Sequence, residues 1–244
     1  MKRILLLLAA GALTLSAQVQ PNQGVSKTLH DLSATGFAAQ TDYAQVCKFC
    51  HSPHGAAPAT AQVIPLWGHK TTAATYTMYN TTNNPNSMMS ATTIVDAAPS
   101  GPSMACLSCH DGTVAVNARM AGGYSYSYGN MNTAATNAGD FNIVGEVSGT
   151  KTYQMGYLTK HIVGAKTGSN VDLTTVHPIG VSYSSAQNPG LWDNPKAPAE
   201  IYAGKVQCAS CHEVHNWSPD GGITGLFLRD TTVGSKLCLD CHNK

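Results

Sequence analysis

The feature that most constrains this chain is a five-residue pattern, C-x-x-C-H, which occurs four times. The pattern accounts for all eight cysteines, as the pairs Cys47/Cys50, Cys106/Cys109, Cys208/Cys211 and Cys238/Cys241, and for the histidines that follow them, His51, His110, His212 and His242. Two thiols at this spacing can bond to the two vinyl groups at one edge of a haem, and the adjacent imidazole can then bind the iron. The sequence therefore predicts four covalent haems c, with the cysteines as attachment sites and the histidines as proximal ligands.

Three other uses of paired cysteines compete with this interpretation. Eight cysteines in an exported chain would first suggest four disulfides. Zinc ribbons use C-x-x-C pairs, and iron–sulfur clusters are held by groups of cysteines. None of these requires a histidine directly after every pair, and the spacing thus favours haem over all three.

Six further histidines could bind the other face of each iron: His30, His54, His69, His161, His177 and His215. The chain has ten histidines, which is enough for two at each of four irons. Methionine is the other common sixth ligand, but several of the eight methionines, such as Met88 and Met89, lie in polar surroundings. A scattered methionine is more often a packing residue than a ligand, so we expect bis-histidine coordination.

Two of these histidines follow a proximal histidine by three residues, His54 in C-H-S-P-H and His215 in C-H-E-V-H. Because it is only three residues away, each lies on the same side of the porphyrin as that proximal histidine. It therefore cannot bind the opposite face of the same iron. As a ligand it would have to bind a second haem, and the short link would force the two haems together. We predict both as distal ligands, with a structural histidine near a crowded site as the alternative.

The other four differ in their surroundings. His177 ends a β-branched run and precedes Pro178, a setting that suits a held ligand. His30 precedes Asp31, which could orient an imidazole or cap a helix. We predict His177 and His30 as distal ligands. His69 and His161 remain open between ligand and ordinary surface histidine.

The first residues have the pattern of a secretory signal. Lys2 and Arg3 precede an apolar run over residues 4–15, and small residues around Ser16 and Ala17 suit cleavage. The run is shorter than the ~20 residues that a membrane span needs. We therefore expect a signal peptide at residues 1–17 and a secreted mature chain without a membrane span. The formal net charge of the whole chain is only +1, and nucleic acid is not an expected partner.

Composition indicates how the mature chain would fold. Only 11% of residues are charged and 7% aromatic, and the haems would have to supply much of the apolar surface that the side chains lack. We predict an irregular, loop-rich fold with short helices and few small strands, a multihaem cytochrome c fold organised around four stacked haems. Short helical turns should carry the motifs, and the apo-chain should be largely unfolded. Residues 121–130, rich in Gly, Tyr and Ser, fit either a short strand or a loop. Residues 18–244 would form one unit, with possible two-haem halves at 18–140 and 141–244.

Several segments resemble the multihaem cytochromes with the doubled C-x-x-C-H motif. They are H-D-L-S at 30–33, C-H-S-P-H-G at 50–55, P-L-W-G-H at 65–69, C-L-S-C-H-D-G-T at 106–113, H-P-I-G-V at 177–181, C-A-S-C-H-E-V-H at 208–215 and F-L-R at 227–229. Haem number, length and spacing are most similar to the OmcE-type extracellular tetrahaem cytochromes, which polymerise into conductive filaments. The resemblance implies bis-histidine haems in a continuous line and an axial ligand donated across a subunit boundary, with His30 or His54 as its natural source.

These observations predict electron transfer, with no catalytic residues. The expected partners are identical subunits in an extracellular or cell-surface filament, together with redox proteins or an extracellular electron acceptor. A soluble periplasmic shuttle is the alternative. A multihaem reductase is the rival from the enzyme class, but it needs an iron with an open position, and the surplus histidines could close every iron.

Overall fold

The computed structural model describes residues 24–25, 30, 46–52, 64, 66–114, 141–147, 150–155, 163–215 and 227–244. The expected signal peptide, His54, His161 and the Gly/Tyr/Ser segment at 121–130 lie outside these residues. Of the hairpin at 141–155 only the backbone is described. All eight motif cysteines and all four motif histidines are included.

Each of the four motifs lies on a short helix or directly after one. The helices are η1 (Val46–Phe49), α1 (Gly101–His110), α2 (Cys208–Cys211) and α3 (Lys236–Leu239), the last preceded by η3 (Val233–Ser235). The longest, α1, begins after the extended Ser100 with a proline in its first turn, where the missing N–H costs no hydrogen bond. A capping box between Gln207 and Ser210 starts α2.

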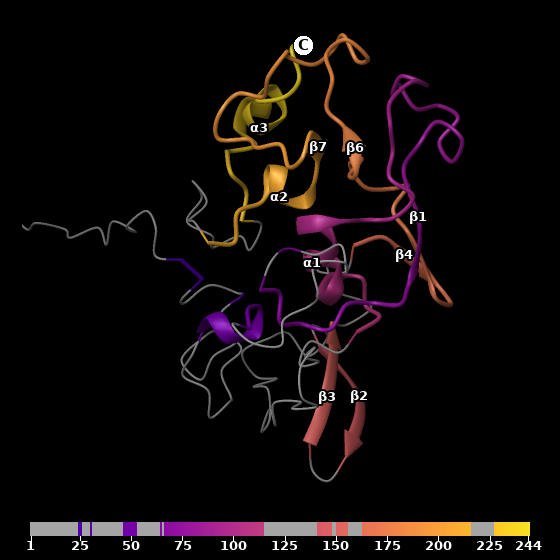
Figure 1. Ribbon diagram of the computed structural model, residues 1–244, viewed down its shortest axis with the longest axis vertical. Helices are drawn as coiled ribbons and strands as arrows, with labels where there is room; N and C mark the ends of the chain where they lie inside the picture. Colours follow the sequence, from indigo (N-terminus) through magenta and orange to yellow (C-terminus); the bar gives the residue numbers. More distant parts are fainter. Residues whose placement is uncertain are drawn as a thin grey trace, which may run out of the picture.

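The strands of the described residues form three separate sheets, and outside one hairpin they have only two or three residues each. One sheet has the order β1 (Thr75–Thr77), β5 (Asn170–Asp172), β4 (Ala165–Thr167), with β1 parallel and β4 antiparallel to β5. A second pairs β6 (Val181–Ser182) with β7 (Lys205–Val206). The third is the antiparallel hairpin of β2 (Phe141–Val147) and β3 (Thr150–Met155), at the end of the molecule opposite the C-terminus (Figure 1).

The described apolar core consists of two small clusters. Met78, Leu107, Val171, Leu173 and Ile179 form the first, between α1 and the sheet of β1, β5 and β4. Trp67 and Ala105 form the second, with Cys50 and Ile64 packed against it. Leu107, which lies between the two cysteines of its motif, has no exposed surface. The side-chain core therefore includes a residue of one motif and lies against the cysteine of another.

The helices follow one another along the long axis of the molecule, with α2 and then α3 beyond α1 toward the C-terminus (Figure 1). α1 contacts α2, and the Cys208 N–H donates to the Ser103 hydroxyl across 2.9 Å. The loop before β7 holds the C-terminal motif, because the Trp192 and Lys196 N–H groups donate to the carbonyls of Cys241 and Asp240. These contacts position the motif helices relative to one another. Among the described residues, no helix is both long enough and apolar enough to cross a membrane.

Candidate haem-binding site

One helical turn sets the local geometry of the motifs. In three of them the histidine N–H donates to the carbonyl of the first cysteine, at 3.0 Å for His51 and Cys47, 3.1 Å for His212 and Cys208, and 2.8 Å for His242 and Cys238. In the remaining motif the cysteines and the histidine lie within α1. Residues three apart lie on the same face of a helix. Each cysteine pair therefore presents two sulfurs on one side of its turn.

All eight cysteines lie in the described part of the chain, and none of them forms a disulfide. Burial raises the pKa of Cys50 and of Cys109 to about 12 and the pKa of Cys241 to about 11. These buried sulfurs are accordingly neutral thiols at physiological pH. The donor set suits thioether attachment of haem and leaves the disulfide alternative without support in the structure.

The cysteines of successive motifs lie near one another. The Cys106 and Cys208 sulfurs share a hydrogen bond. This bond and burial raise the pKa of Cys106, while the same bond lowers the pKa of Cys208 to about 7. After burial, the nearby Cys109 adds to the raised pKa of Cys50. Cys208 and Cys238 likewise add to that of Cys211. The motifs thus form a spatial series in which the first neighbours the second, the second the third, and the third the fourth.

Three motif histidines each face a second histidine that the sequence predicts as a distal ligand. The ring centroids are 5.9 Å apart for His30 and His110, 6.0 Å for His51 and His215, and 6.5 Å for His177 and His242. A transition metal held by two imidazole nitrogens at about 2 Å each would separate the ring centroids by roughly 6 Å. The pairs therefore have the spacing that a bis-histidine iron requires.

The protonation of two of these rings also suits metal binding. Burial, and then the charge of His215, lowers the pKa of His51. Burial lowers the pKa of His177 as well, and the nearby His242 adds to the effect. Neutral imidazole is the form that binds a metal, so both rings are held in the ligating form.

Two histidines have their tautomer fixed by a backbone carbonyl. His177 Nδ1 lies 3.1 Å from the Pro178 carbonyl oxygen, and His69 Nδ1 lies 2.9 Å from that of Lys70. A carbonyl only accepts, so Nδ1 carries the proton and Nε2 keeps its free electron pair, as in most metal-binding histidines. His69 is only 2% exposed, and the expectation that it could be an ordinary surface histidine is wrong. The preceding Gly68 lies against the first motif: its N–H donates to the Cys50 carbonyl at 2.7 Å, and a Cβ there would lie 2.9 Å from the Ser52 Cβ.

The fourth predicted distal ligand, His54, lies outside the described residues, as does His161, whose role stays open. His212, the proximal histidine of the third motif, forms an isolated antiparallel bridge with Leu228. Its distal ligand stays a prediction.

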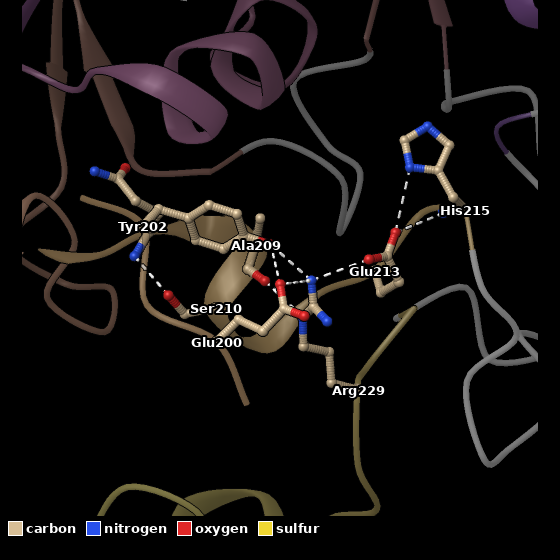
Figure 2. Close-up of polar contacts among 8 residues, drawn as sticks. Glu200, Tyr202, Ala209, Ser210, Glu213, His215 and Arg229 are labelled. Atoms are coloured by element: carbon tan, nitrogen blue, oxygen red, sulfur yellow. Dashed lines mark hydrogen bonds and ion pairs between the residues drawn. The ribbon is translucent and has the colours of Figure 1, made fainter. Parts of the chain in front are cut away.

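Sequence reasoning missed the acidic residues that directly follow two of the motifs. Asp111 is fully buried and accepts hydrogen bonds from the Tyr76 hydroxyl at 2.7 Å and from the Thr113 N–H and hydroxyl at 2.8 and 2.7 Å. Burial, and then this hydrogen bond to Asp111, raises the pKa of Tyr76. Glu213 lies between Arg229 and His215 (Figure 2). The sequence does mark these two residues, since each is an acidic residue directly after a C-x-x-C-H motif, in C-H-D-G-T and C-H-E-V-H.

Comparison with known proteins finds a family match in the C-terminal part of the chain. Residues 201–244 match the family described as the doubled CXXCH motif, and they include the third and fourth motifs. No curated protein matches the chain. The family match supports a c-type cytochrome of the multihaem class, with covalently bound haem c and a role in electron transfer. Proteins of this class are generally extracytoplasmic, and they are typically electron carriers and not enzymes.

Proposed function

We propose that this protein carries electrons through four bis-histidine haems c. The observation that carries the proposal is the set of three histidine pairs, each joining a motif histidine to a second imidazole at a centroid separation of 5.9 to 6.5 Å. Haem iron supplies reversible one-electron chemistry when it is bound. The chain's own residues would anchor the ring edge through thiols and provide both axial nitrogens, and burial keeps His51 and His177 neutral.

We assign the distal ligands from these pairs. His215 would complete the site of the first motif, His30 that of the second and His177 that of the fourth. For the third motif we propose His54, because it stands in the same relation to His51 as His215 does to His212. The first and third sites would then exchange ligands reciprocally, which favours close approach of their haems.

The spatial series of cysteines supports a continuous path for electrons. Neighbouring motifs lie near one another at Cys50 and Cys109, at the hydrogen-bonded Cys106 and Cys208, and at Cys211 and Cys238. A carrier of this kind benefits from closely spaced irons that are closed to substrate. A reductase would need one open iron and nearby acid or cationic groups at it.

At a finer level, we propose that the mature chain is the subunit of an extracellular conductive filament. This step is supported by the resemblance to the OmcE-type tetrahaem cytochromes. Identical subunits and an extracellular acceptor are then its partners. The resemblance offers His30 or His54 for donation across a subunit boundary; because His30 already lies beside His110 of its own chain, His54 would, in the filament, reach the third site of a neighbouring subunit instead of that of its own chain. A soluble periplasmic shuttle is the second candidate.

Two measurements on the mature protein test the number of haems and the filament separately. Intact mass should exceed the polypeptide mass by four haems, and a value of three or fewer would contradict the four-site assignment. Electron microscopy of the purified protein should show filaments that persist on dilution. Particles of single-subunit size alone would reject the filament and retain the shuttle.

The ligand of the third site can be tested by substitution. His54→Ala should convert one low-spin haem to a high-spin form, whereas His69→Ala and His161→Ala should leave all four low-spin. A high-spin haem in either of the latter two variants, with four low-spin haems in His54→Ala, would transfer the assignment to that histidine.

A further inference from the structure

The buried Arg229 is the centre of a polar network near the third motif (Figure 2). Its side chain is 7% exposed, and its Nε donates to the Ala209 carbonyl, within α2, at 2.7 Å. Its Nη2 lies 3.0 Å from Oε2 of Glu213 and 3.0 Å from Oε2 of Glu200. The Tyr202 hydroxyl accepts from the same nitrogen at 2.7 Å and donates to Glu200 at 2.7 Å. Arg229 is thus fixed in the network through α2 and two carboxylates.

Glu213 uses its two carboxylate oxygens in different directions (Figure 2). Oε2 accepts from Arg229, while Oε1 accepts from the His215 N–H at 2.9 Å and lies 3.3 Å from His215 Nδ1. The backbone of Glu213 is held as well, because its N–H donates to the Phe227 carbonyl at 2.7 Å. The carboxylate therefore has a fixed position between a buried cation and one edge of the His215 ring.

A carboxylate at Nδ1 has a definite effect on an imidazole ligand. It stabilises the tautomer with the proton on Nδ1, leaves Nε2 free to bind a metal, fixes the ring orientation and makes the ring a stronger donor. The His215 ring is stacked against that of His51, with an angle of 27° between the planes. Their centroid separation of 6.0 Å is close to that of an axial pair.

We propose that Glu213 is a positioning residue for His215, held in place by Arg229, and that it tunes the haem of the first motif. The inference rests on the proposed bis-histidine function and names a regulator of one of its four irons. Glu213 is the neighbour of His212 in the third motif, yet its carboxylate acts on a ligand of the first. The effect on potential is negative, because a charged acceptor at Nδ1 makes the ligand a stronger donor and favours ferric iron.

Glu200 provides a matched control for a merely structural ion pair. It contacts the same Arg229 nitrogen at the same 3.0 Å, but its other described side-chain contact is with Tyr202 and not with a histidine. Glu213→Gln and Glu200→Gln each remove one charge from the same arginine. They differ in whether an imidazole loses its charged acceptor.

The test is a potentiometric titration of the holoprotein, followed by visible absorption and by electron paramagnetic resonance of the ferric haems. Glu213→Gln should raise the midpoint of one haem out of four and shift the g-values of one low-spin signal, while Glu200→Gln leaves all four unchanged. Equal effects of the two substitutions, or none from Glu213→Gln, would overturn the proposal.

A second variant is needed in case Glu213→Gln does not fold with its haems attached. Glu213→Asp keeps the charge on a shorter side chain, and it should shift one signal by less than the complete loss does. Four unchanged signals in Glu213→Asp would overturn the proposal in that case. If the proposed bis-histidine coordination itself is wrong, the unsubstituted protein will not show four low-spin bis-histidine signals, and this result is distinct from any effect of the Glu213 substitutions.

Discussion

At the scale of single residues, the site depends on which imidazole nitrogen is free. Backbone carbonyls fix this for His177 and His69, and a carboxylate does so for His215. The sequence could predict His177 and His215 as ligand candidates because the signals, a following proline and a C-H-x-x-H spacing, are local. It could not predict the pairing of His215 with His51, since the two residues come from motifs far apart in the chain.

Substitution of His177 tests the residue-scale assignment. Because methionine raises the potential of a haem relative to histidine, His177→Met should raise the midpoint of one haem and leave the other three in place. His177→Ala should give one high-spin haem, which added imidazole returns to low spin. Potentiometry and absorption spectra measure both effects. Four unchanged midpoints in His177→Met would remove this histidine from the ligand set.

Tyr202 predicts a pH dependence of stability. Burial, and then its hydrogen bond to Glu200, raises the pKa of Tyr202 to about 12, against about 10 in an unfolded chain. The folded state therefore retains this proton where the unfolded state loses it, and the resulting stabilisation is present below pH 10 and is lost as the pH rises through 12.

The expected result is that the melting temperature of the holoprotein falls between about pH 10 and pH 12, and falls less steeply in Tyr202→Phe. Tyr79→Phe is the control, because Tyr79 lies outside the Arg229 network. If the alkaline slope in Tyr202→Phe equals that of the unsubstituted protein, Tyr202 is not the group responsible.

At the scale of elements, the helices could be foreseen and the strands could not. Helical turns at the motifs follow from the cysteine spacing, whereas the hydrogen bond from the Gln207 N–H to the Ser210 hydroxyl at the start of α2 reverses the usual residue order of a capping box and gives no sequence signal. The described strands outside the β2–β3 hairpin have only two or three residues, which is too short for an alternating pattern to show. The parallel pairing of β1 with β5 joins Tyr76 to Val171, and contacts at such separation leave no local signal.

The turn before β4 gives an element-scale prediction. Gly164 has φ +82°, and a Cβ there would lie 2.5 Å from the Asp172 carbonyl oxygen. Gly168, in the β4–β5 turn, has φ +61° with no neighbour within 4 Å of such an atom. Gly168→Ala should cost about 1 kcal/mol from backbone strain alone. Gly164→Ala should cost about 3 kcal/mol, because overpacking adds to the strain.

Chemical or thermal unfolding of the two glycine variants measures this difference. Equal losses of unfolding free energy would show that β4 can shift away from β5 and accommodate the methyl group. A larger loss in Gly168→Ala would contradict the packing described for this turn.

At the scale of the whole molecule, the motifs and not the side-chain core set the organisation. The larger of the two buried apolar clusters among the described residues has five members, in keeping with the shortage of apolar side chains that composition indicates. Residues before and after position 140 share the sheet of β1, β5 and β4, and α1 contacts α2. The order of the motifs in space could not be read from the sequence, because it depends on tertiary contacts between their cysteines.

This organisation predicts that the chain without haem is largely unfolded, since bound cofactors would contribute folding free energy as structural metals do. Circular dichroism of protein produced without haem attachment should show little regular structure and no cooperative melting, in contrast to the holoprotein. A cooperative transition in the apo-chain at the melting temperature of the holoprotein would show that the side chains suffice.

If every iron is closed by two histidines, no haem of the ferrous holoprotein has a free position for carbon monoxide. We expect four low-spin haems whose absorption spectrum does not change when carbon monoxide is added. A high-spin haem that binds carbon monoxide in the unsubstituted protein would contradict it, because an open iron belongs to an active site and not to a path for electrons.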